Sequence, residues 1–142
     1  MTHSAIVEVR GRRVWDSRGR PTVEAEIVVE GGVCGRAIAP AGASTGAGEA
    51  KDLRDGGTAL GGFDVRRAVG HLNGEIRTAL LGMDVLEQAV LDAALVALDG
   101  TRDKSRLGGN ALVAVSLACA HAAAAAAGVP LWRHLAGERA VA

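Results

Sequence analysis

The residues best suited to chemistry in this sequence are two hydroxyls within a run of small side chains. Residues 40–50 read PAGASTGAGEA, with Ser44 and Thr45 at the centre and neither an aromatic nor a basic residue. Such a run suits three uses: a phosphate cradle, a flexible connection, or a lid that brings one hydroxyl to a site built elsewhere. The first and third uses require a backbone that comes close to a ligand, which small residues allow.

Neither common phosphate-binding motif is present in this run. A Walker loop needs two glycines separated by four residues and followed at once by Lys and a hydroxyl residue. Here Gly42 and Gly46 have three residues between them, and Ala47 follows. A dinucleotide fingerprint needs a third glycine that opens a helix after a parallel strand, whereas Gly48 leads into Glu49. The residues alone therefore favour a mobile connection between a sheet and the helices.

Other chemically able side chains lack partners at useful spacing. Three histidines occupy helical positions with no second ligand at metal spacing, and we expect surface or core histidines: His71, His121 and His134. Ser116 lies on an apolar helix, and we expect its hydroxyl to bond a carbonyl one turn earlier. Three aspartates flank loops, where carboxylates usually cap turns: Asp16, Asp52 and Asp55. The residues thus indicate no nucleophile with a base beside it and no carboxylate trio for a metal.

Length and composition indicate one globular domain over residues 1–142, with hydrophobic residues at 49% and charged residues at 23%. The aromatic residues are Trp15, Phe63 and Trp132, so the core must be built from Ala, Val and Leu. Sixteen basic residues balance sixteen acidic ones, and no basic stretch carries stacking aromatics. We therefore expect no nucleic-acid partner.

Cysteine usage and the N-terminus predict a cytoplasmic protein. Cys34 and Cys119 lie in a strand-like run and an Ala-rich helix, and we expect both to be buried thiols in a reducing compartment. The start MTHSAIVEVRGRR does not resemble a signal peptide. Residues 111–129 approach the length of a membrane span, but about half are alanine and His121 lies inside. We expect a buried helix in a soluble protein, without membrane contact.

Three short strands are predicted before the small-residue run. Residues 4–10 (SAIVEVR) read as the first strand. Residues 21–30 alternate apolar residues with glutamates, the period of two typical of a strand with one wet face. Gly31-Gly32 predicts a tight turn, and residues 33–40 return as the third strand. With Arg18-Gly19 in the first turn, these short connections imply an antiparallel meander.

The hydrophobic period becomes helical after this run. Apolar residues spaced by three and four predict a helix over residues 64–80, despite two interior glycines. Asp84 and Glu87 have the form of a capping box that opens a helix ending at Asp99-Gly100.

A polar loop, residues 101–110, then precedes an Ala-rich helix that we expect Asn110 to cap. That helix reaches about Ala127 and stops at Gly128 and Pro130, and residues 130–135 begin a short fourth helix. Three strands followed by about four helices make an α+β fold.

The ordered set of motifs is more specific than any one of them. Four segments carry it, in this order: WDSRGRPTVEAE from Trp15, APAGASTGAGEA from Ala39, LRDGG from Leu53, and LDGTRDKSRLGGNALVAVSLACAHAAAAAAGVPLWRHL from Leu98. In order and spacing they closely resemble the N-terminal domain of enolase, phosphopyruvate hydratase, from about residue 6 to residue 135.

The resemblance implies a three-stranded meander and four helices that precede a larger barrel. Enolase converts 2-phosphoglycerate to phosphoenolpyruvate and water in glycolysis, with a lysine base and Mg²⁺-binding carboxylates on the barrel. The sequence, which ends AGERAVA, includes none of those barrel residues, so we expect no catalytic residue in this chain and no activity from it alone.

The resemblance also assigns roles to individual residues. In the family the serine of the small-residue loop closes over substrate and binds the second magnesium. By motif that serine is Ser44, within a substrate lid formed by Gly42, Ala43, Ser44 and Thr45. Arg12 and Glu24 match positions that contact the other subunit of the family's homodimer, although from the residues alone both are simply charges on a sheet.

Small departures suggest a divergent member: PAG replaces PSG, SRLGGNA replaces SRLGANA, and a lysine common before the first helix is missing. Three interpretations remain open. The chain is part of a truncated or split enolase, part of a paralogue acting on a related phosphonate or carboxylate, or a non-catalytic module that docks on an enolase barrel.

Overall fold

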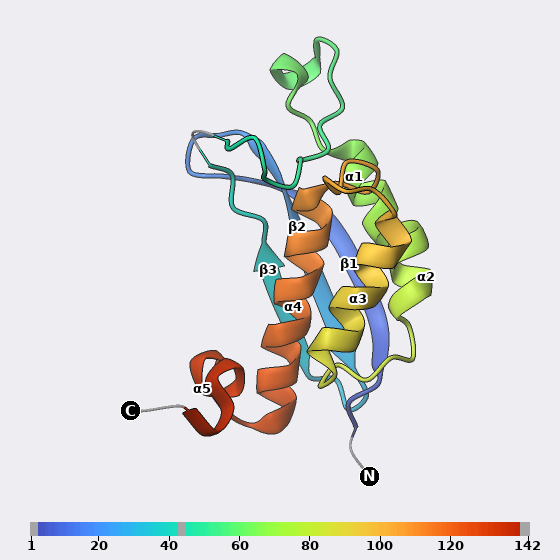
Figure 1. The fold of residues 1–142 in the computed structure, drawn as a ribbon, viewed down its shortest axis with the longest axis vertical. Helices are drawn as coiled ribbons and strands as arrows, with labels where there is room; N and C mark the ends of the chain where they lie inside the picture. The colour runs from blue at the N-terminus through green and yellow to red at the C-terminus, as the bar shows by residue number, and fades with distance from the viewer. Residues whose placement is uncertain (1–2, 43–44, 140–142) are drawn as a thin grey trace.

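Three antiparallel strands precede the helices, which confirms the predicted α+β order (Figure 1). The structure is a computed structural model, and it describes residues 3–42 and 45–139. The strands are β1 (Ile6–Trp15), β2 (Pro21–Val29) and β3 (Cys34–Ile38), and they lie in the order β1-β2-β3. Their sequence order equals their spatial order, as in a meander.

The first strand is longer than the predicted residues 4–10. It pairs with β2 as far as Trp15, which lies opposite Pro21. The period of two is hidden here because Gly11 occupies an inward position. A Cβ atom on Gly11 would lie 2.6 Å from Cβ of Leu72, so the missing side chain lets a helix approach the strand.

The predicted turns are confirmed. Gly31 and Gly32 both have φ of +87°, and Gly19 between β1 and β2 has φ of +74°. These left-handed conformations favour glycine because it lacks a Cβ atom. The third strand is shorter at both ends than the predicted residues 33–40.

The predicted helix over residues 64–80 is interrupted. It consists of α1 (Arg66–His71), a π-helical turn over Leu72–Ile76, and α2 (Arg77–Leu80). The break lies at Gly74, whose φ and ψ are both −105°. Glycine in a helix interior weakens it, and here it permits a conformation outside the α region. A short 3₁₀ turn, Ala59–Gly62, precedes α1.

The remaining helices are α3 (Gln88–Asp99), α4 (Gly109–Ala127) and α5 (Leu131–Ala136), followed by a 3₁₀ turn over Gly137–Arg139. The predicted stop of α4 is confirmed, since Gly128 has φ of +69°. The predicted capping box is wrong: the Asp84 carboxylate accepts from the Leu86 N–H, and α3 starts without a side-chain cap. Asp84 instead pairs with Ala5 in an isolated β-bridge.

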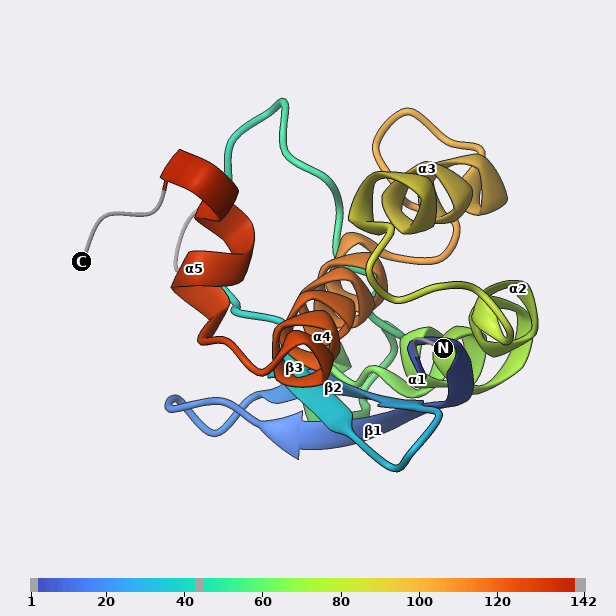
Figure 2. The ribbon, with the colours of Figure 1, turned by 90° about the horizontal axis from the view of Figure 1, so that it is seen from below.

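The sheet and α4 form the two main layers. Seen along the sheet in Figure 2, α4 covers one face, and it packs against β2 and β3. The core consists of Val, Ile, Leu and Ala, as predicted, whereas Trp15, Phe63 and Trp132 are about half exposed. Cys119 is buried, but the prediction of a buried Cys34 is wrong, because that residue lies on the outer side of edge strand β3.

Among the described helices, α4 is long and apolar enough by composition to cross a membrane. In the domain, 61% of its most apolar window is buried. Core helices of soluble proteins pass the same test, so the composition does not distinguish the two environments.

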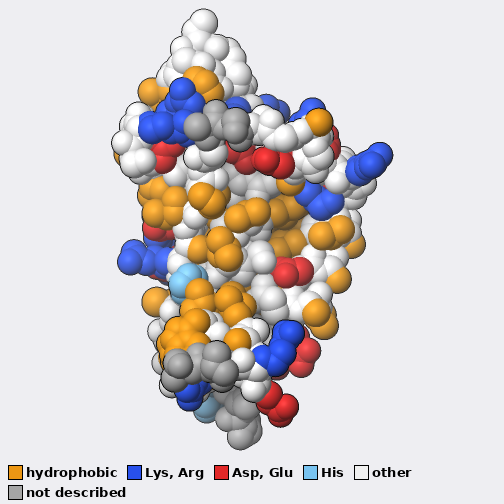
Figure 3. Space-filling view, turned by 60° about the vertical axis from the view of Figure 1, so that its left-hand side comes forward, with side chains coloured by type: hydrophobic (Ala, Val, Ile, Leu, Met, Phe, Trp, Pro, Cys, Tyr) orange, Lys and Arg blue, Asp and Glu red, His pale blue; other side chains and the backbone are white. Residues whose placement is uncertain are grey.

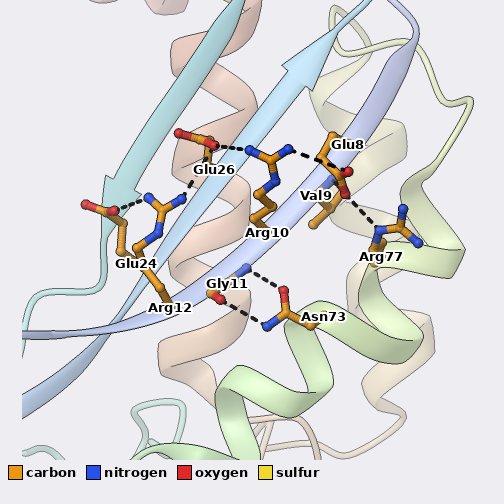
Figure 4. Close-up of polar contacts among 9 residues, drawn as sticks. All are labelled: Glu8, Val9, Arg10, Gly11, Arg12, Glu24, Glu26, Asn73 and Arg77. Atoms are coloured by element: carbon orange, nitrogen blue, oxygen red, sulfur yellow. Dashed lines mark hydrogen bonds and ion pairs between the residues drawn. The ribbon is translucent and has the colours of Figure 1, made fainter.

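The free edge of β1 is bound by a side chain from the π-helical turn. Asn73 accepts a hydrogen bond from Gly11 N–H through Oδ1, at 2.8 Å, and donates one to the Gly11 carbonyl through Nδ2, at 3.0 Å (Figure 4). One amide group thus reproduces the pairing of a neighbouring strand and satisfies a strand edge.

Replacing Asn73 with Ala is expected to lower the free energy of unfolding by about 1–2 kcal/mol, because both Gly11 backbone groups lose their partner. Urea denaturation followed by circular dichroism measures this. The matched control is Arg66→Ala on the same helical segment, with an expected change within about 0.5 kcal/mol. Equal losses in the two variants would contradict a specific role for the amide.

Candidate functional site

The small-residue loop leaves the sheet under tight backbone control. Ala39 N–H donates to the Val23 carbonyl at 2.8 Å, and the buried Thr22 hydroxyl donates to the Ala39 carbonyl at 2.7 Å. Beyond them, Arg18 Nη2 donates to the carbonyls of Ala41 and Gly42 at 3.2 and 3.4 Å. A side chain from the β1–β2 turn therefore holds the first half of the loop.

The second half of the loop closes on itself. Gly46 N–H donates to Glu49 Oε1 at 3.0 Å, and Glu49 N–H donates to the Gly46 carbonyl at 3.2 Å. This reciprocal pair satisfies two backbone groups in the manner of a capping box. Residues 42 and 46, the glycines on either side of the predicted lid serine, are thus each bound by a charged side chain.

The loop then rejoins the helical layer at the start of α4. Lys51 N–H donates to the Asp103 carbonyl, and Gly109 N–H donates to the Lys51 carbonyl, both at 2.7 Å. Close packing here requires glycine, since a Cβ atom on Gly108 would lie 2.6 Å from Cβ of Leu53.

Asn110 anchors this junction instead of capping α4 as predicted. The cap position is Gly108, and Asn110 is the second residue of the helix. Its Oδ1 accepts from Leu53 N–H at 3.0 Å, and its Nδ2 donates to the Leu53 carbonyl at 3.2 Å. The side chain is 2% exposed, so the far-off backbone of Leu53 takes the hydrogen-bonding capacity that a cap would use.

The predicted lid residues are only partly within the described chain. Gly42 and Thr45 are exposed and line an open groove of about 730 Å³ that also contacts Glu49 and Lys51. Ala43 and Ser44 lie outside the described residues. The assignment of Ser44 as a magnesium ligand therefore stays a prediction.

Within residues 3–42 and 45–139, no group of three or more His, Cys, Asp or Glu side chains could hold a metal ion. His71 Nδ1 lies 3.4 Å from Glu75 Oε1, one helical turn away. His121 is exposed and His134 is half-buried. Burial raises the pKa of the Cys119 thiol to about 12, which leaves that group protonated and a poor nucleophile.

Ser116 does not bond back to its own helix as predicted. Its hydroxyl donates to Asp92 Oδ1 at 2.7 Å and accepts from Gln88 Nε2 at 3.1 Å. Both partners lie on α3, so the serine links two helices. A serine beside a carboxylate, without an intervening base, lacks the arrangement that activates a nucleophile.

The predicted turn-capping role of the aspartates is confirmed for Asp16, whereas Asp55 binds the start of a distant helix instead of its own turn. Asp16 Oδ1 accepts from the N–H groups of Arg18 and Arg20 at 2.8 and 2.9 Å. These backbone bonds, that from Arg20 first, lower the pKa of Asp16. Asp55 accepts from the first two N–H groups of α1, at 2.8 and 3.0 Å.

Asp52 differs from Asp16 and Asp55 in that its partner is a charged side chain and not a backbone N–H group. Its described contact is an ion pair with Arg54, in which Oδ2 lies 3.5 Å from Nη2.

The predicted dimer-interface residues pair with each other inside the chain. Arg12 Nη1 lies 2.5 Å from Glu24 Oε1, and the two residues are directly opposite in the β1–β2 register. Figure 4 shows this pair at one end of an alternating row that continues through Glu26 and Arg10 to Glu8. The bond to Glu24 is the main cause that raises the pKa of Arg12.

The described part of the loop, Gly42 and residues 45–50, is therefore exposed and is held by hydrogen bonds on both sides, and no acid–base pair lies among these residues. Sequence reasoning missed Arg18, Glu49 and Asn110, which hold the loop. Glu49 had a local signal, because it follows Gly46 at the spacing of a capping box. The partners of Arg18 and Asn110 lie 24 and 57 residues away, beyond any local pattern.

The family model described as "Enolase, N-terminal domain" matches residues 6–135, which is nearly the whole chain.

Proposed function

This chain belongs to the family of enolase N-terminal domains, and on that premise we propose that it is the N-terminal portion of a cytoplasmic enolase-like lyase. The reaction is the conversion of 2-phosphoglycerate to phosphoenolpyruvate and water in glycolysis. The observation that carries this proposal is the family match over residues 6–135, which includes the small-residue loop. The basic catalytic groups of that reaction belong to a barrel outside these 142 residues.

The contribution of this chain is the lid formed by Gly42, Ala43, Ser44 and Thr45. A lid requires fixed ends and a short segment between them. The anchors at Arg18, Glu49 and Asn110 supply the fixed ends and support this role. Closure of such small residues over a bound substrate excludes water and brings the Ser44 hydroxyl close to it.

Magnesium enters the proposal through Ser44 only. The described residues contain no set of side chains that fits a magnesium ion, and Mg²⁺ requires about six oxygen ligands in near-octahedral geometry. A single hydroxyl adds one neutral oxygen ligand to an ion held by other groups. The magnesium site of the complete enzyme therefore belongs mainly to the barrel.

A reconstitution experiment tests the proposal. The purified chain is mixed with a separately produced enolase barrel domain, Mg²⁺ and 2-phosphoglycerate, and phosphoenolpyruvate is followed by absorbance. We expect no turnover from the chain alone and turnover from the mixture. A Ser44→Ala chain is expected to bind the barrel equally well but to lower kcat by about tenfold or more, because one oxygen ligand is lost.

Two results would contradict the proposal. Turnover by rigorously purified chain without a barrel would show that its own residues suffice. Barrel binding with no gain in turnover would instead support the second candidate, a non-catalytic module that docks on an enolase barrel.

That second candidate is favoured by exposed apolar side chains. Figure 3 shows hydrophobic side chains spread over the face that carries α4 and α5. Val113 and Leu117 of α4 are 41% and 40% exposed, and Leu135 of α5 is 60% exposed. Apolar surface gathered in this way is typical of a docking face.

The same domain would also suit an enolase paralogue that catalyses a related reaction. A paralogue that acts on a phosphonate or another carboxylated substrate would share this domain, because the barrel sets specificity. Reconstitution with such a substrate in place of 2-phosphoglycerate distinguishes the two. The homodimer contact of Arg12 and Glu24 is likewise proposed for the complete enzyme.

A further inference from the structure

We propose that the free edge of β3 binds an extended, acidic segment of a partner protein, which joins the sheet as a fourth strand with a carboxylate opposite Arg36. The inference goes beyond the proposed lyase function and does not depend on it, because it concerns a sheet edge and not the small-residue loop. Three observations support it: unused backbone groups on β3, a closed opposite edge, and a surplus basic side chain.

The backbone of β3 presents unused donors and acceptors along its outer edge. Val29 N–H donates to the Val33 carbonyl at 2.9 Å, and Ala39 N–H donates to the Val23 carbonyl at 2.8 Å. Opposite residues in an antiparallel pair exchange hydrogen bonds only at every second position, so the backbone groups of the intervening residues point away from β2. These edge residues are Cys34, Arg36 and Ile38. Among residues 3–42 and 45–139, no other backbone group bonds to them.

The opposite edge of the sheet is closed. Asn73 bonds both backbone groups of Gly11 (Figure 4), and Ile6 N–H donates to the Met83 carbonyl at 2.9 Å. A free strand edge is a template for another chain, and a peptide that adds to such an edge gains affinity from main-chain hydrogen bonds. In the described part of the chain, β3 is thus the edge at which a fourth strand can be added.

Arg36 is a surplus basic side chain on the outer face of the sheet. Glu26 lies directly opposite it in the β2–β3 register, yet the Glu26 carboxylate pairs with Arg10 and Arg12, at 3.3 and 3.5 Å. Glu24 likewise pairs with Arg12. Arg36 itself is exposed and belongs to none of the ion pairs among the described residues. An acidic side chain on an added strand would pair favourably with it.

The same charge disfavours a second copy of this chain as the occupant. When two β3 strands pair antiparallel about a two-fold axis at their centre, the two Arg36 side chains lie opposite each other. Like charges in that position are destabilising, and charged residues on edge strands keep copies apart in this way. An acidic strand meets no such repulsion, so the edge suits an acidic partner.

The peptide Thr-Val-Ala-Glu-Ala-Val-Thr tests the inference on the full 142-residue chain. Paired antiparallel with β3, it places its glutamate opposite Arg36 and its valines opposite Cys34 and Ile38. Its alanines lie on the side of α4, whose backbone comes close to Gly35. We expect saturation to slow amide hydrogen exchange at the edge residues about tenfold or more, because each N–H gains a carbonyl partner. The amides of Gly35 and Ala37, which already bond to β2, are expected to change little.

Charge variants separate strand addition from general attraction. A peptide with lysine in place of glutamate is expected to bind the parent about fivefold more weakly, and Arg36→Glu is expected to reverse that preference. Arg102→Glu is the matched control, because Arg102 is exposed in the loop before α4 and the net charge changes equally. It should keep the preference of the parent. N-methylation of the peptide glutamate keeps the charge but removes the donor to the Arg36 carbonyl, so it should weaken binding.

Cys34 makes even weak pairing measurable, because its thiol is free and exposed whereas Cys119 is buried. Opposite residues in a hydrogen-bonded pair have Cα atoms about 5.5 Å apart, a separation that a disulfide spans. A peptide with cysteine in place of the valine opposite Cys34 is equilibrated with the chain in a glutathione buffer, and mass spectrometry measures the mixed disulfide. We expect about fivefold more capture of the glutamate peptide than of the lysine peptide.

Two results would overturn the inference. Equal capture of the two cysteine peptides would show that the edge does not select an acidic strand. Protection of the edge-residue amides that rises with chain concentration in the absence of peptide would assign the edge to a second copy instead.

Discussion

Replacing Gly35 with alanine is expected to lower the free energy of unfolding by about 3 kcal/mol or more, or to prevent stable folding. A Cβ atom at this position of β3 would lie 2.2 Å from Ala122 N and 2.4 Å from the Ala118 carbonyl oxygen. Both atoms belong to the backbone of α4, so no side-chain rotation removes the overlap. The helix and the sheet would have to separate.

The loss of packing would extend across the whole contact between α4 and the sheet. α4 packs on β2 and β3 through alanines that are nearly fully buried, including Ala118 and Ala122. Small side chains on both surfaces allow this close approach, and dispersion contacts fall off steeply with separation. A shift that relieves one methyl group therefore weakens contacts along the helix.

Thermal and urea denaturation of Gly35→Ala measure the effect, and Gly70→Ala is the matched control. Gly70 lies in α1, its φ is not in the left-handed region, and an added Cβ would meet nothing within 4 Å. Alanine there is expected to raise stability by about 0.5–1 kcal/mol, because it favours helix. Similar losses in both variants would contradict the packing argument.

The layered fold could be predicted because its signals are local. The alternation of β2, the Gly31-Gly32 turn and the end of α4 at Gly128 each lie within a few residues. The same reasoning failed where a polar side chain had a distant partner. Ser116 bonds to Asp92, 24 residues away, and Asn110 bonds to Leu53, 57 residues away. Neither side chain makes the local bond that the sequence predicts.

The candidate site likewise has a part that could be predicted from local sequence and a part that could not. The composition of the loop could be recognised locally, and the ordered motifs placed it in a family. The groups that hold it could not be predicted, because Arg18 reaches the loop only after β1 and β2 have folded back on each other. A residue in a polar turn gives no sign of such a contact in its own neighbourhood.

Replacing Asp99 with alanine is expected to lower the free energy of unfolding by about 3 kcal/mol. The residue is 2% exposed at the end of α3. Its carboxylate accepts from the N–H groups of Thr101 and Leu107, at 2.9 and 2.8 Å, and from the Thr101 hydroxyl. Removal leaves the buried Leu107 N–H without this acceptor and frees the loop that leads to the start of α4.

Asp99→Asn tests the charge separately. The amide keeps one acceptor but turns an NH₂ group toward an N–H donor, so we expect about 2 kcal/mol of destabilisation. Asp103→Asn in the same loop is the control, and its loss of stability is expected to be smaller, since the Asp103 carboxylate accepts an exposed hydrogen bond from Ser105 N–H. Urea denaturation at pH 7 compares the free energies of unfolding of the three variants, Asp99→Ala, Asp99→Asn and Asp103→Asn, with that of the parent chain.

The pH dependence of stability identifies the same group. Burial raises the pKa of Asp99, but the hydrogen bonds from the Thr101 hydroxyl and the Leu107 N–H outweigh it and lower the pKa below its ordinary value of 3.8. The unfolded chain therefore binds a proton more readily than the folded one. The stability that Asp99 contributes is complete above that ordinary value and is lost as the pH falls through the lower folded-state pKa. Urea denaturation between about pH 6 and pH 2 should show a steeper loss for the parent than for Asp99→Asn, and parallel curves would contradict the assignment.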